Sequence, residues 1–301
     1  MKIQYEKISK ILFDVNMFDR KTLIAAQSIV RSIEATGVGI FPGSAEFWHF
    51  NDKIAQKYLF ESFAIPCCPT LIFYDRDCAI NWAASVSYPK IFKLKCGAGS
   101  SNVTMVKSFA QAESLINQMF GAGKRSISSI FQDMATKVYK HKKNHDWIKT
   151  LRNIHHTIRN LRNVNRSTPC EIGYAYFQDF MSGNYFDTRI TVIGDRAFAF
   201  RRMVRKNDFR ASGSGNVDWD IKKIDLKSVE LAFETSKRIG ARCMAYDIIY
   251  DQNGSPVIIE CCYRFIPSAV FSCSGYWDRS LVFHQGHIWP QDLIIYDTIL
   301  S

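Results

Sequence analysis

A run of lysines and glycines between residues 88 and 103 has the composition of a phosphate-binding segment. The run reads YPKIFKLKCGAGSSNV, in which a short β-rich stretch leads to Lys93 and Lys95. A loop of small residues follows at once, made of Gly97, Ala98, Gly99, Ser100 and Ser101. Glycines let backbone N–H groups approach phosphate oxygens closely, and a lysine adds a point charge. On these residues alone, a hairpin with a small-residue turn is an equal alternative.

Two carboxylates, Asp247 and Glu260, are predicted on the two strands of a hairpin that turns at residues 251–254. Both can project from one face of the strand pair. Carboxylates among isoleucines and valines are costly to bury unless they are paired or bound to a metal. Mg²⁺ bridging nucleotide phosphates is the natural occupant of such a pair. The alternative is a structural pair of carboxylates, salt-bridged to Arg242 or Arg264.

Arginines are dense in the middle of the chain, at positions 189, 201, 202, 205 and 210. Arg210 begins the small-residue loop RASGSG. A guanidinium beside free backbone amides suits a developing phosphoryl group or a tetrahedral oxyanion. The alternative is an exposed basic hairpin, which applies best to Arg202 and Arg205.

A β-rich run ends on four residues that could form a purine site: Gln178, Asp179, Phe180 and Met181. They combine backbone hydrogen-bonding groups with an aromatic ring and a methionine. Asp187, a few residues later, could accept hydrogen bonds from ribose hydroxyls. The alternative is a strand end built from ordinary core residues.

The elements that would position these residues follow from hydrophobic periodicity. Helices are predicted over residues 22–36, 52–63, 110–120 and 227–239. Strands are predicted over 38–41, 70–74, 174–180, 187–193, 197–204, 243–250 and 257–261, and an apolar run covers 103–106. The mixture of helices and clustered strands indicates an α+β or mixed α/β architecture.

The composition indicates a globular protein of one large or two modest domains. The chain has 301 residues, of which 47% are hydrophobic and 22% charged. No apolar run approaches the roughly 20 residues that span a bilayer, and the N-terminus lacks the pattern of a signal peptide. The nine cysteines include no C-x-x-C. We therefore expect reduced, mostly buried thiols and a cytoplasmic location.

In order along the chain, these pieces resemble the ATP-grasp superfamily, in its branch of carboxylate–amine ligases that includes glutathione synthetase and the glutamate ligase of a ribosomal protein. Within that branch the chain is similar to ligases of bacterial surface-polysaccharide synthesis. Five blocks carry the resemblance: FWHFNDKIAQKYLFE, YPKIFKLKCGAGSSNV, YFQDFMSGNYFDTRITVIGDRAFAF, NDFRASGSG and YDIIYDQNGSPVIIECCYRF. They extend from about Phe41 to the C-terminus.

The resemblance implies an ATP-grasp fold, in which two α+β subdomains grip a nucleotide. Residues 1–50 would be a short α/β N-terminal region, and residues 51–301 the ATP-grasp domain. Its small lid subdomain would cover about 88–180, with a basic helical insertion at 124–166. Its large subdomain would cover about 181–301.

The family pattern also implies ATP and Mg²⁺ as cofactors. Lys53 and Lys93 match the phosphate-contacting lysines, Gln178 to Met181 the adenine linker, and Asp187 the acidic residue on the ribose side. Lys95, Gly97, Gly99, Ser100, Ser101 and Arg201 complete the predicted nucleotide site. Arg210 matches the arginine that stabilises the acyl-phosphate step. Arg210 and Lys93 are the predicted catalytic residues.

Asp247 and Glu260 match two of the family's three metal-ligand positions. The third position, normally asparagine, is Cys262. A thiol is a poor ligand for a hard cation. Either the two carboxylates suffice, with water in the gap, or metal binding is weakened.

The segment 124–166 is strongly basic, with eleven Lys and Arg against two Asp. An apolar stripe at Ile148, Leu151, Ile154, Ile158 and Leu161 predicts a helix with its basic face in water. An acidic saccharide is one candidate partner, and RNA or peripheral contact with an anionic membrane is another. The scarcity of aromatic residues argues against base stacking on nucleic acid. A solvated helical insertion is an equal alternative.

The leading functional hypothesis is an ATP-dependent ligase that forms an amide through an acyl phosphate. Its substrates would be a carboxylate and an amine, for example a uronic-acid sugar of a capsule or O-antigen joined to an amino acid. The first alternative is a non-catalytic ATP-binding scaffold, suggested by Cys262 and the short N-terminal region. The second is a basic nucleic-acid-binding protein, which no recognised motif supports.

Overall fold

The computed structural model describes residues 8–15, 20–97, 102–125, 170–205 and 208–297, and these divide into two compact units. The larger unit comprises Met1–Val15, Lys21–Pro69 and Met181–Ser301, and the smaller comprises Asn16–Arg20 and Thr70–Phe180. The lid predicted at about 88–180 falls within the second segment of the smaller unit, Thr70–Phe180, and its boundaries stay a prediction. Two sets of predicted residues lie outside the described ones: the insertion 124–166 beyond Arg125, and Gly99, Ser100 and Ser101.

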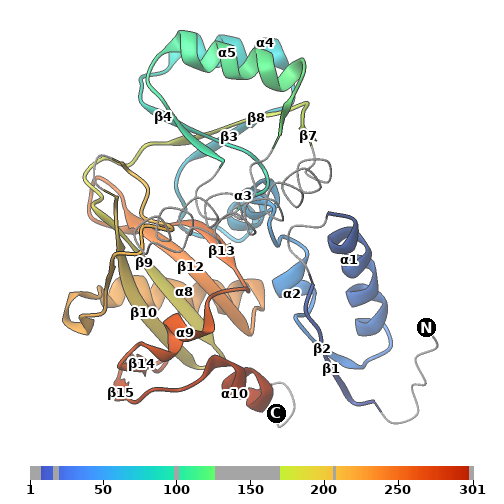
Figure 1. Cartoon of the computed structure of the whole chain (residues 1–301), viewed down its shortest axis with the longest axis vertical. Coiled ribbons are helices and arrows are strands. Elements are labelled where there is room, and N and C mark those ends of the chain that lie inside the picture. The colour runs from blue at the N-terminus through green and yellow to red at the C-terminus, as the bar shows by residue number, and fades with distance from the viewer. Residues whose placement is uncertain (1–7, 16–19, 98–101, 126–169, 206–207, 298–301) are drawn as a thin grey trace, which may run out of the picture. The chain divides into compact units, whose positions relative to one another are not determined.

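The smaller unit is an antiparallel sheet with two helices on one face (Figure 1). The sheet has the order β3-β8-β4-β5, with β3 at Thr70–Phe73, β8 at Ala175–Asp179, β4 at Lys90–Lys93 and β5 at Val103–Val106. The helices are α4, Arg76–Ser85, and α5, Phe109–Phe120. Two short strands, β6 (Lys124–Arg125) and β7 (Cys170–Glu171), pair separately. The unit extends back to residue 70 because β3 pairs along its whole length with β8.

The larger unit is built on a seven-stranded antiparallel sheet. The path is β13-β12-β9-β10-β14-β15, with β11 paired to β10. The strands are β9 (Phe186–Ile193), β10 (Arg196–Met203), β11 (Val217–Asp218), β12 (Cys243–Tyr250), β13 (Pro256–Cys262), β14 (Gly275–Trp277) and β15 (Phe283–Gln285). The predicted hairpin of β12 and β13 is present, with Asp247 directly opposite Glu260.

Helices cover both faces of this sheet (Figure 1). Helix α8 (Leu226–Ile239) lies on the face that carries Tyr246, whose hydroxyl is 2.8 Å from the Ser236 hydroxyl. Helices α9 (Pro267–Phe271) and α10 (Pro290–Ile295) contribute to an apolar cluster on the opposite face. Its sheet members include Ile193, Phe198 and Phe200. Since successive strand residues face opposite ways, Asp247 lies on the face away from α8.

The described residues 8–15 and 20–69 contain a pair of short strands and three helices. Strands β1 (Lys10–Leu12) and β2 (Gly39–Phe41) pair in parallel, and α1 (Arg20–Glu34) connects them. The short helix α2 (Ser44–Phe47) and helix α3 (Lys53–Ser62) follow. Asp52 begins α3 as its N-cap, with its carboxylate accepting a hydrogen bond from the Ala55 N–H.

The predicted thiol state is confirmed in part. All nine cysteines are free, but Cys78 and Cys170 are exposed rather than buried. Among the described residues, no helix has both the length and the apolar character needed to cross a membrane.

Candidate functional site

Four charged side chains face one another on neighbouring strands of the larger sheet. Arg202 of β10 lies opposite Asp187 of β9, and Arg189 of β9 lies opposite Asp247 of β12. Asp187 and Arg189 are two residues apart on one strand, so they share a face. We call these four residues the charge ladder.

The charge ladder is closed by bidentate ion pairs. Arg202 donates from Nε and Nη2 to the two carboxylate oxygens of Asp187, at 2.7 and 2.6 Å. Arg189 donates in the same way to Asp247, at 2.7 and 2.8 Å. The Nη2 of Arg202 also lies 2.7 Å from Oδ2 of Asp247. Both carboxylates are only 4% exposed, so this geometry supplies the charge compensation that buried carboxylates need.

Burial and pairing act in opposite directions on the two aspartates of the ladder. Burial would raise the pKa of Asp247, but the guanidiniums of Arg189 and Arg202 outweigh it, and this pKa lies below its ordinary value. For Asp187, burial dominates over the opposing effect of Arg202, and the charge of Asp247 adds to it, so this pKa is raised. Asp247 is therefore the carboxylate held firmly in its charged form.

Glu260, opposite Asp247, has a different environment. Its Oε1 lies 3.2 Å from Nζ of Lys53, and its side chain is 34% exposed. Lys53 is the first residue of α3, and the side-chain amide of Gln56 fixes that helix to strand β13. Gln56 donates to the carbonyl of Cys261 at 2.8 Å and accepts from its N–H at 3.2 Å. Gln56 thereby holds Lys53 beside Glu260.

These residues do not fit a magnesium site that uses both carboxylates. Both oxygens of Asp247 are bound by guanidinium N–H groups, whereas Mg²⁺ requires oxygen ligands free to approach it. Cys262 keeps its proton, because burial raises its pKa to about 11, and its thiol lies 2.9 Å from the Arg264 carbonyl oxygen. No metal-binding group of three or more His, Cys, Asp or Glu occurs in the described part of the chain. Of the three residues matched to metal positions, Glu260 is the one whose carboxylate is not held by guanidinium groups in the described structure.

The structure also corrects the predicted salt bridges. Asp247 pairs with Arg189 and Arg202, not with Arg242 or Arg264. Arg242 instead pairs with Glu46, and Arg264 with Asp14. Nor is Arg202 on an exposed basic hairpin, since it is 8% exposed.

Two predicted arginines lie apart from the charge ladder. Arg201 alternates with Arg202 along β10, so it points to the opposite face, where it pairs with Asp218 and stacks on Phe186. Arg210 donates from Nε and Nη2 to the carboxylate of Asp208, two residues earlier. The structure therefore does not bring either arginine together with Asp187 and Asp247.

The smaller unit holds the other predicted nucleotide-binding residues. Lys93 ends β4 and is 6% exposed, and the N–H of Lys95 donates to the hydroxyl of Tyr174 at 2.7 Å. Gly97 has φ = 123°, and a Cβ there would collide with the side-chain amide of Asn102. Glycine is thus required where the loop leaves the strand.

Residues of the predicted adenine linker, Gln178 to Met181, form hydrogen bonds and an ion pair with nearby residues in the described structure. The amide of Gln178 donates to the Thr70 hydroxyl at 3.0 Å, and Asp179 pairs with Lys90 at 2.6 Å. Both bonds tie β8 to a neighbouring strand. Phe180 follows β8, and Met181 accepts a hydrogen bond from Asn184 through its carbonyl, at 3.2 Å. The adenine role of these residues stays a prediction.

Sequence reasoning did not assign Arg189, Arg202 and Gln56 to the site. The arginines were noted only as part of a cationic region. The spacing Asp187-x-Arg189 on a predicted strand was an available signal, because it places opposite charges on one face. The role of Gln56 depends on a contact with β13, far along the chain, and no local pattern indicates it.

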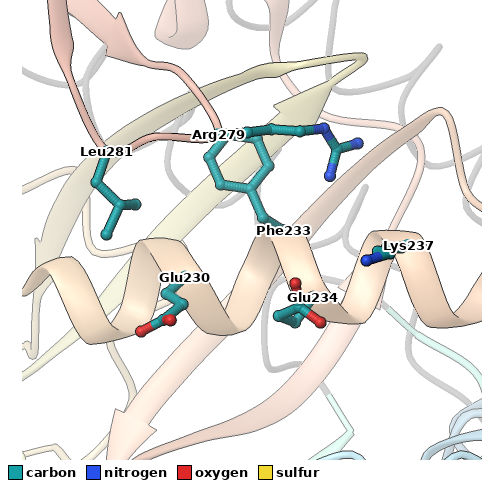
Figure 2. A pocket seen from close by; sticks show the side chains of 6 residues that line it. All are labelled: Glu230, Phe233, Glu234, Lys237, Arg279 and Leu281. Atoms are coloured by element: carbon teal, nitrogen blue, oxygen red, sulfur yellow. The ribbon is translucent and has the colours of Figure 1, made fainter.

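A cavity of about 450 Å³ lies elsewhere on the larger unit, beside helix α8 (Figure 2). Glu230, Phe233, Glu234 and Lys237 line it from the helix, and Arg279 and Leu281 from the loop between β14 and β15. Arg279 lies over the ring of Phe233 and pairs with Asp195. None of the predicted site residues lines this cavity.

Comparison of the sequence with known proteins gives one distant likeness to a ligase. The chain is 20% identical over 249 residues to the α-aminoadipate–LysW ligase LysX of Saccharolobus solfataricus, covering 82% of this chain and 74% of that protein. No protein-family model matches the chain.

Solved structures show the fold. A RimK-domain ATP-grasp protein from Sphaerobacter thermophilus superposes with a TM-score of 0.53 at 13% identity, covering 98% of this chain and 83% of that one. Biotin carboxylase from Campylobacter jejuni gives 0.55 at 13% identity, covering 95% and 54%. D-cycloserine synthetase DcsG gives 0.53 at 11% identity, covering 87% and 77%. The chain has the ATP-grasp fold, as its sequence motifs predicted.

Proposed function

We propose that this protein is an ATP-dependent carboxylate–amine ligase. The observation that carries the proposal is the ATP-grasp fold along nearly the whole chain, combined with the distant likeness to a protein named as a ligase. The Lys53–Glu260 pair adds a lysine and a half-exposed carboxylate held together by helix α3. A fold alone is compatible with several activities, so the residues below carry the specific claims.

ATP is the proposed nucleotide, with Mg²⁺ as its counter-ion. The C. jejuni biotin carboxylase of this fold was solved as a β,γ-ATP complex. In this chain Lys53 and Lys93 would contact phosphates, and Gly97 would let backbone amides approach them. Phe180 and Met181 would hold the adenine. Glu260 is the side chain that fits a contact with Mg²⁺, whose remaining ligands would be nucleotide oxygens and water.

The proposed reaction has two steps. An oxygen of the substrate carboxylate attacks the γ-phosphorus of ATP, the bond to the β,γ-bridging oxygen breaks, and an acyl phosphate and ADP form. The substrate amine then attacks the acyl carbon, loses a proton and expels inorganic phosphate, which leaves an amide. Both steps need positioned positive charge more than covalent help from the protein. Lys53, Lys93 and Arg210 would supply that charge.

The substrates are a carboxylate and an amine whose identity is the open part of this proposal. The name of LysX describes a ligase that acts on α-aminoadipate and LysW, so acidic amino acids and acidic peptides are reasonable candidates. A uronic-acid saccharide is a further candidate carboxylate, proposed from the resemblance of the sequence motifs to ligases of surface-polysaccharide synthesis.

Phosphate release from ATP tests the ligase proposal. The full chain is incubated with ATP, Mg²⁺ and pairs of carboxylates and amines, including α-aminoadipate, acidic peptides and uronic acids. We expect release that requires both substrates and an amide product by mass spectrometry. Lys53→Met, which keeps the buried stem but removes the charge, should abolish it. Failure of the wild type to bind ATP would contradict the proposal outright.

A second candidate is ATP binding without catalysis. The pairing of Asp247 with two arginines and the protonated thiol of Cys262 favour it, because both reduce the oxygen ligands available to a metal. Calorimetry with ATP would then show binding, while no substrate pair gives phosphate release. Turnover with any pair would exclude this candidate.

For the basic segment 124–166 we propose an acidic partner, either an anionic saccharide or an anionic membrane surface. The support is its excess of Lys and Arg. Binding to polyuronate or to vesicles with anionic lipids should weaken steeply as salt rises, and replacing its lysines by glutamine should remove it. Equal binding to neutral dextran and neutral vesicles would contradict this assignment.

A further inference from the structure

The two carboxylates on β12 and β13 differ in what a metal ion would have to displace. Asp247 accepts three short hydrogen bonds from two guanidiniums, and its side chain is 5% exposed. Glu260 has one contact with Lys53 at 3.2 Å, and its side chain is 34% exposed. A cation approaching from solvent therefore has access to Glu260 but not to Asp247.

We infer that Asp247 is a structural counter-ion of Arg189 and Arg202 and not a metal ligand, and that Glu260 is the carboxylate of the pair that contacts the cation of a bound nucleotide. The second half of this inference rests on the proposed ATP binding. The first half stands on the ion pairs alone. It departs from the sequence pattern, which matched both carboxylates to metal positions.

Charge balance in the ladder supports the structural role. The ladder contains two guanidiniums and two carboxylates, so it is neutral as it stands. A divalent cation on Asp247 would place a third positive centre beside Arg189 and Arg202, in a region shielded from water. Buried groups feel such repulsion strongly, because the local dielectric response is weak. Removing Asp247 from its partners would also leave charged guanidinium groups without compensation.

Glu260 has the opposite properties. Its side chain is 34% exposed, although that of its partner Lys53 is only 6% exposed. Strand β13 lies at the end of the sheet path, and on its outer side Cys67 forms an isolated bridge with Ile258.

The test compares how strongly added Mg²⁺ improves the affinity for ATP in different variants. Calorimetry gives the dissociation constant of ATP in MgCl₂ and in EDTA, and their ratio isolates the metal contribution from other losses. The variants are Glu260→Gln and the charge-balanced double variant Arg189→Gln/Asp247→Asn. The double variant removes one guanidinium and one carboxylate together, so Arg202 and Asp187 remain paired.

We expect the ratio to fall at least tenfold in Glu260→Gln and to stay within twofold of the wild type in the double variant. The same loss of ratio in both would overturn the inference, because Asp247 would then share the cation. A ratio in Glu260→Gln equal to that of the wild type would also overturn it.

Thermal unfolding without nucleotide tests the first half separately. In the metal-free protein, a carboxylate that serves only as a metal ligand is repelled by neighbouring carboxylates. Replacing it by asparagine removes this repulsion, so the variant unfolds at the same or a higher temperature. A structural counter-ion gives the reverse. We expect Asp247→Asn to lower the unfolding midpoint by about 10 °C, with partial recovery in the double variant. An unchanged or raised midpoint would contradict the structural role. If the wild type binds no ATP at all, the proposed function fails, and this measurement still shows whether Asp247 stabilises the fold as a counter-ion.

Discussion

Asp247 and Glu260 face each other across neighbouring strands, yet the structure gives them contrasting surroundings. Asp247 lies on β12, inside the sheet, between guanidiniums of β9 and β10. Glu260 lies on β13, at the end of the strand path, beside the lysine that begins α3. The comparison teaches that two carboxylates on adjacent strands can differ in accessibility. The side chain on the inner strand is 5% exposed and enclosed by ion pairs, whereas that on the last strand is 34% exposed.

The largest expected effect is on the stability contributed by the charge ladder around Asp247. Arg202→Met leaves Asp187 without its bidentate partner and removes one contact from Asp247. We expect the free energy of unfolding to fall by about 4 kcal/mol, as when one partner of a buried ion pair is removed. Urea denaturation measures this change.

Arg201→Met is the matched control for that prediction. Arg201 is the preceding residue on the same strand, but its partner Asp218 lies nearer to solvent, at 21% side-chain exposure. We expect a loss of about 1 kcal/mol. Equal losses in the two variants would show that the charge ladder has no special contribution.

The free energy of unfolding should depend on pH through His49, which contacts strand β13. Its Nε2 donates to the Ala45 carbonyl at 2.9 Å, and its Nδ1 lies 3.7 Å from the Cys261 sulfur. Burial lowers the pKa of His49 from its ordinary value of 6.5 to about 4. Between these values the unfolded chain binds a proton that the folded chain does not, so stability falls as pH drops.

We expect the stability of the wild type to fall by about 2 kcal/mol through His49 between pH 7 and pH 5. Urea denaturation across this range measures the loss. His49→Gln should show a flatter dependence over the same interval, because glutamine does not titrate. The same slope in both proteins would assign the pH dependence to other groups.

On the open side of the comparison, Lys53→Met should have a modest effect on folding. Methionine keeps the buried apolar stem of Lys53, and Glu260, whose side chain is 34% exposed, stays in contact with water when its partner is removed, so we expect a loss of about 1 kcal/mol. Affinity for ATP should fall at least tenfold, because the proposed phosphate contact is lost. A variant that unfolds much more easily, or that binds ATP normally, would contradict the assignment of Lys53 to the functional side.

The smallest effect is expected for Cys262→Asn, which restores the residue that the family pattern has at the third metal position. An asparagine amide can replace the thiol contact to the Arg264 carbonyl. We expect stability within about 1 kcal/mol of the wild type, and an unchanged effect of Mg²⁺ on ATP binding, because Asp247 stays paired. A large gain in the metal effect by calorimetry would indicate that Asp247 can be recruited.

Much of the fold could be predicted because its main elements have clear periodicity. The predicted helix 52–63 is α3, and the helix 227–239, ended by Gly240, is α8 with Gly240 in the left-handed conformation. Helix α4 was missed, because the residues that it buries are the small Ala79 and Ala83, which give a weak apolar stripe. Strands β14 and β15, of three residues each, were also missed.

The candidate site could be predicted only in part. The prediction that Asp247 and Glu260 can share one face of the hairpin agrees with their pairing in the structure. The turn alone does not give this register, because the pair Ile248–Ile258 would be followed by Asp247 opposite Ile259; a register shift between Asp247 and Ile248 brings Glu260 there instead. The cationic partners were wrong, because the arginines close in sequence are not those close in the sheet. Arg189 reaches Asp247 from 58 residues away, through the placement of β9 beside β12. Such long-range pairing requires the strand order, which local patterns do not contain.

A crystal structure of the protein with a non-hydrolysable ATP analogue and Mn²⁺ tests the central claim most directly. Anomalous scattering locates the metal without assumptions about the surrounding density. The account predicts a manganese peak at coordination distance from Glu260, about 2.2 Å, with Asp247 still held by Arg189 and Arg202. A manganese ion that bridges Asp247 and Glu260, with the arginines displaced, would contradict it.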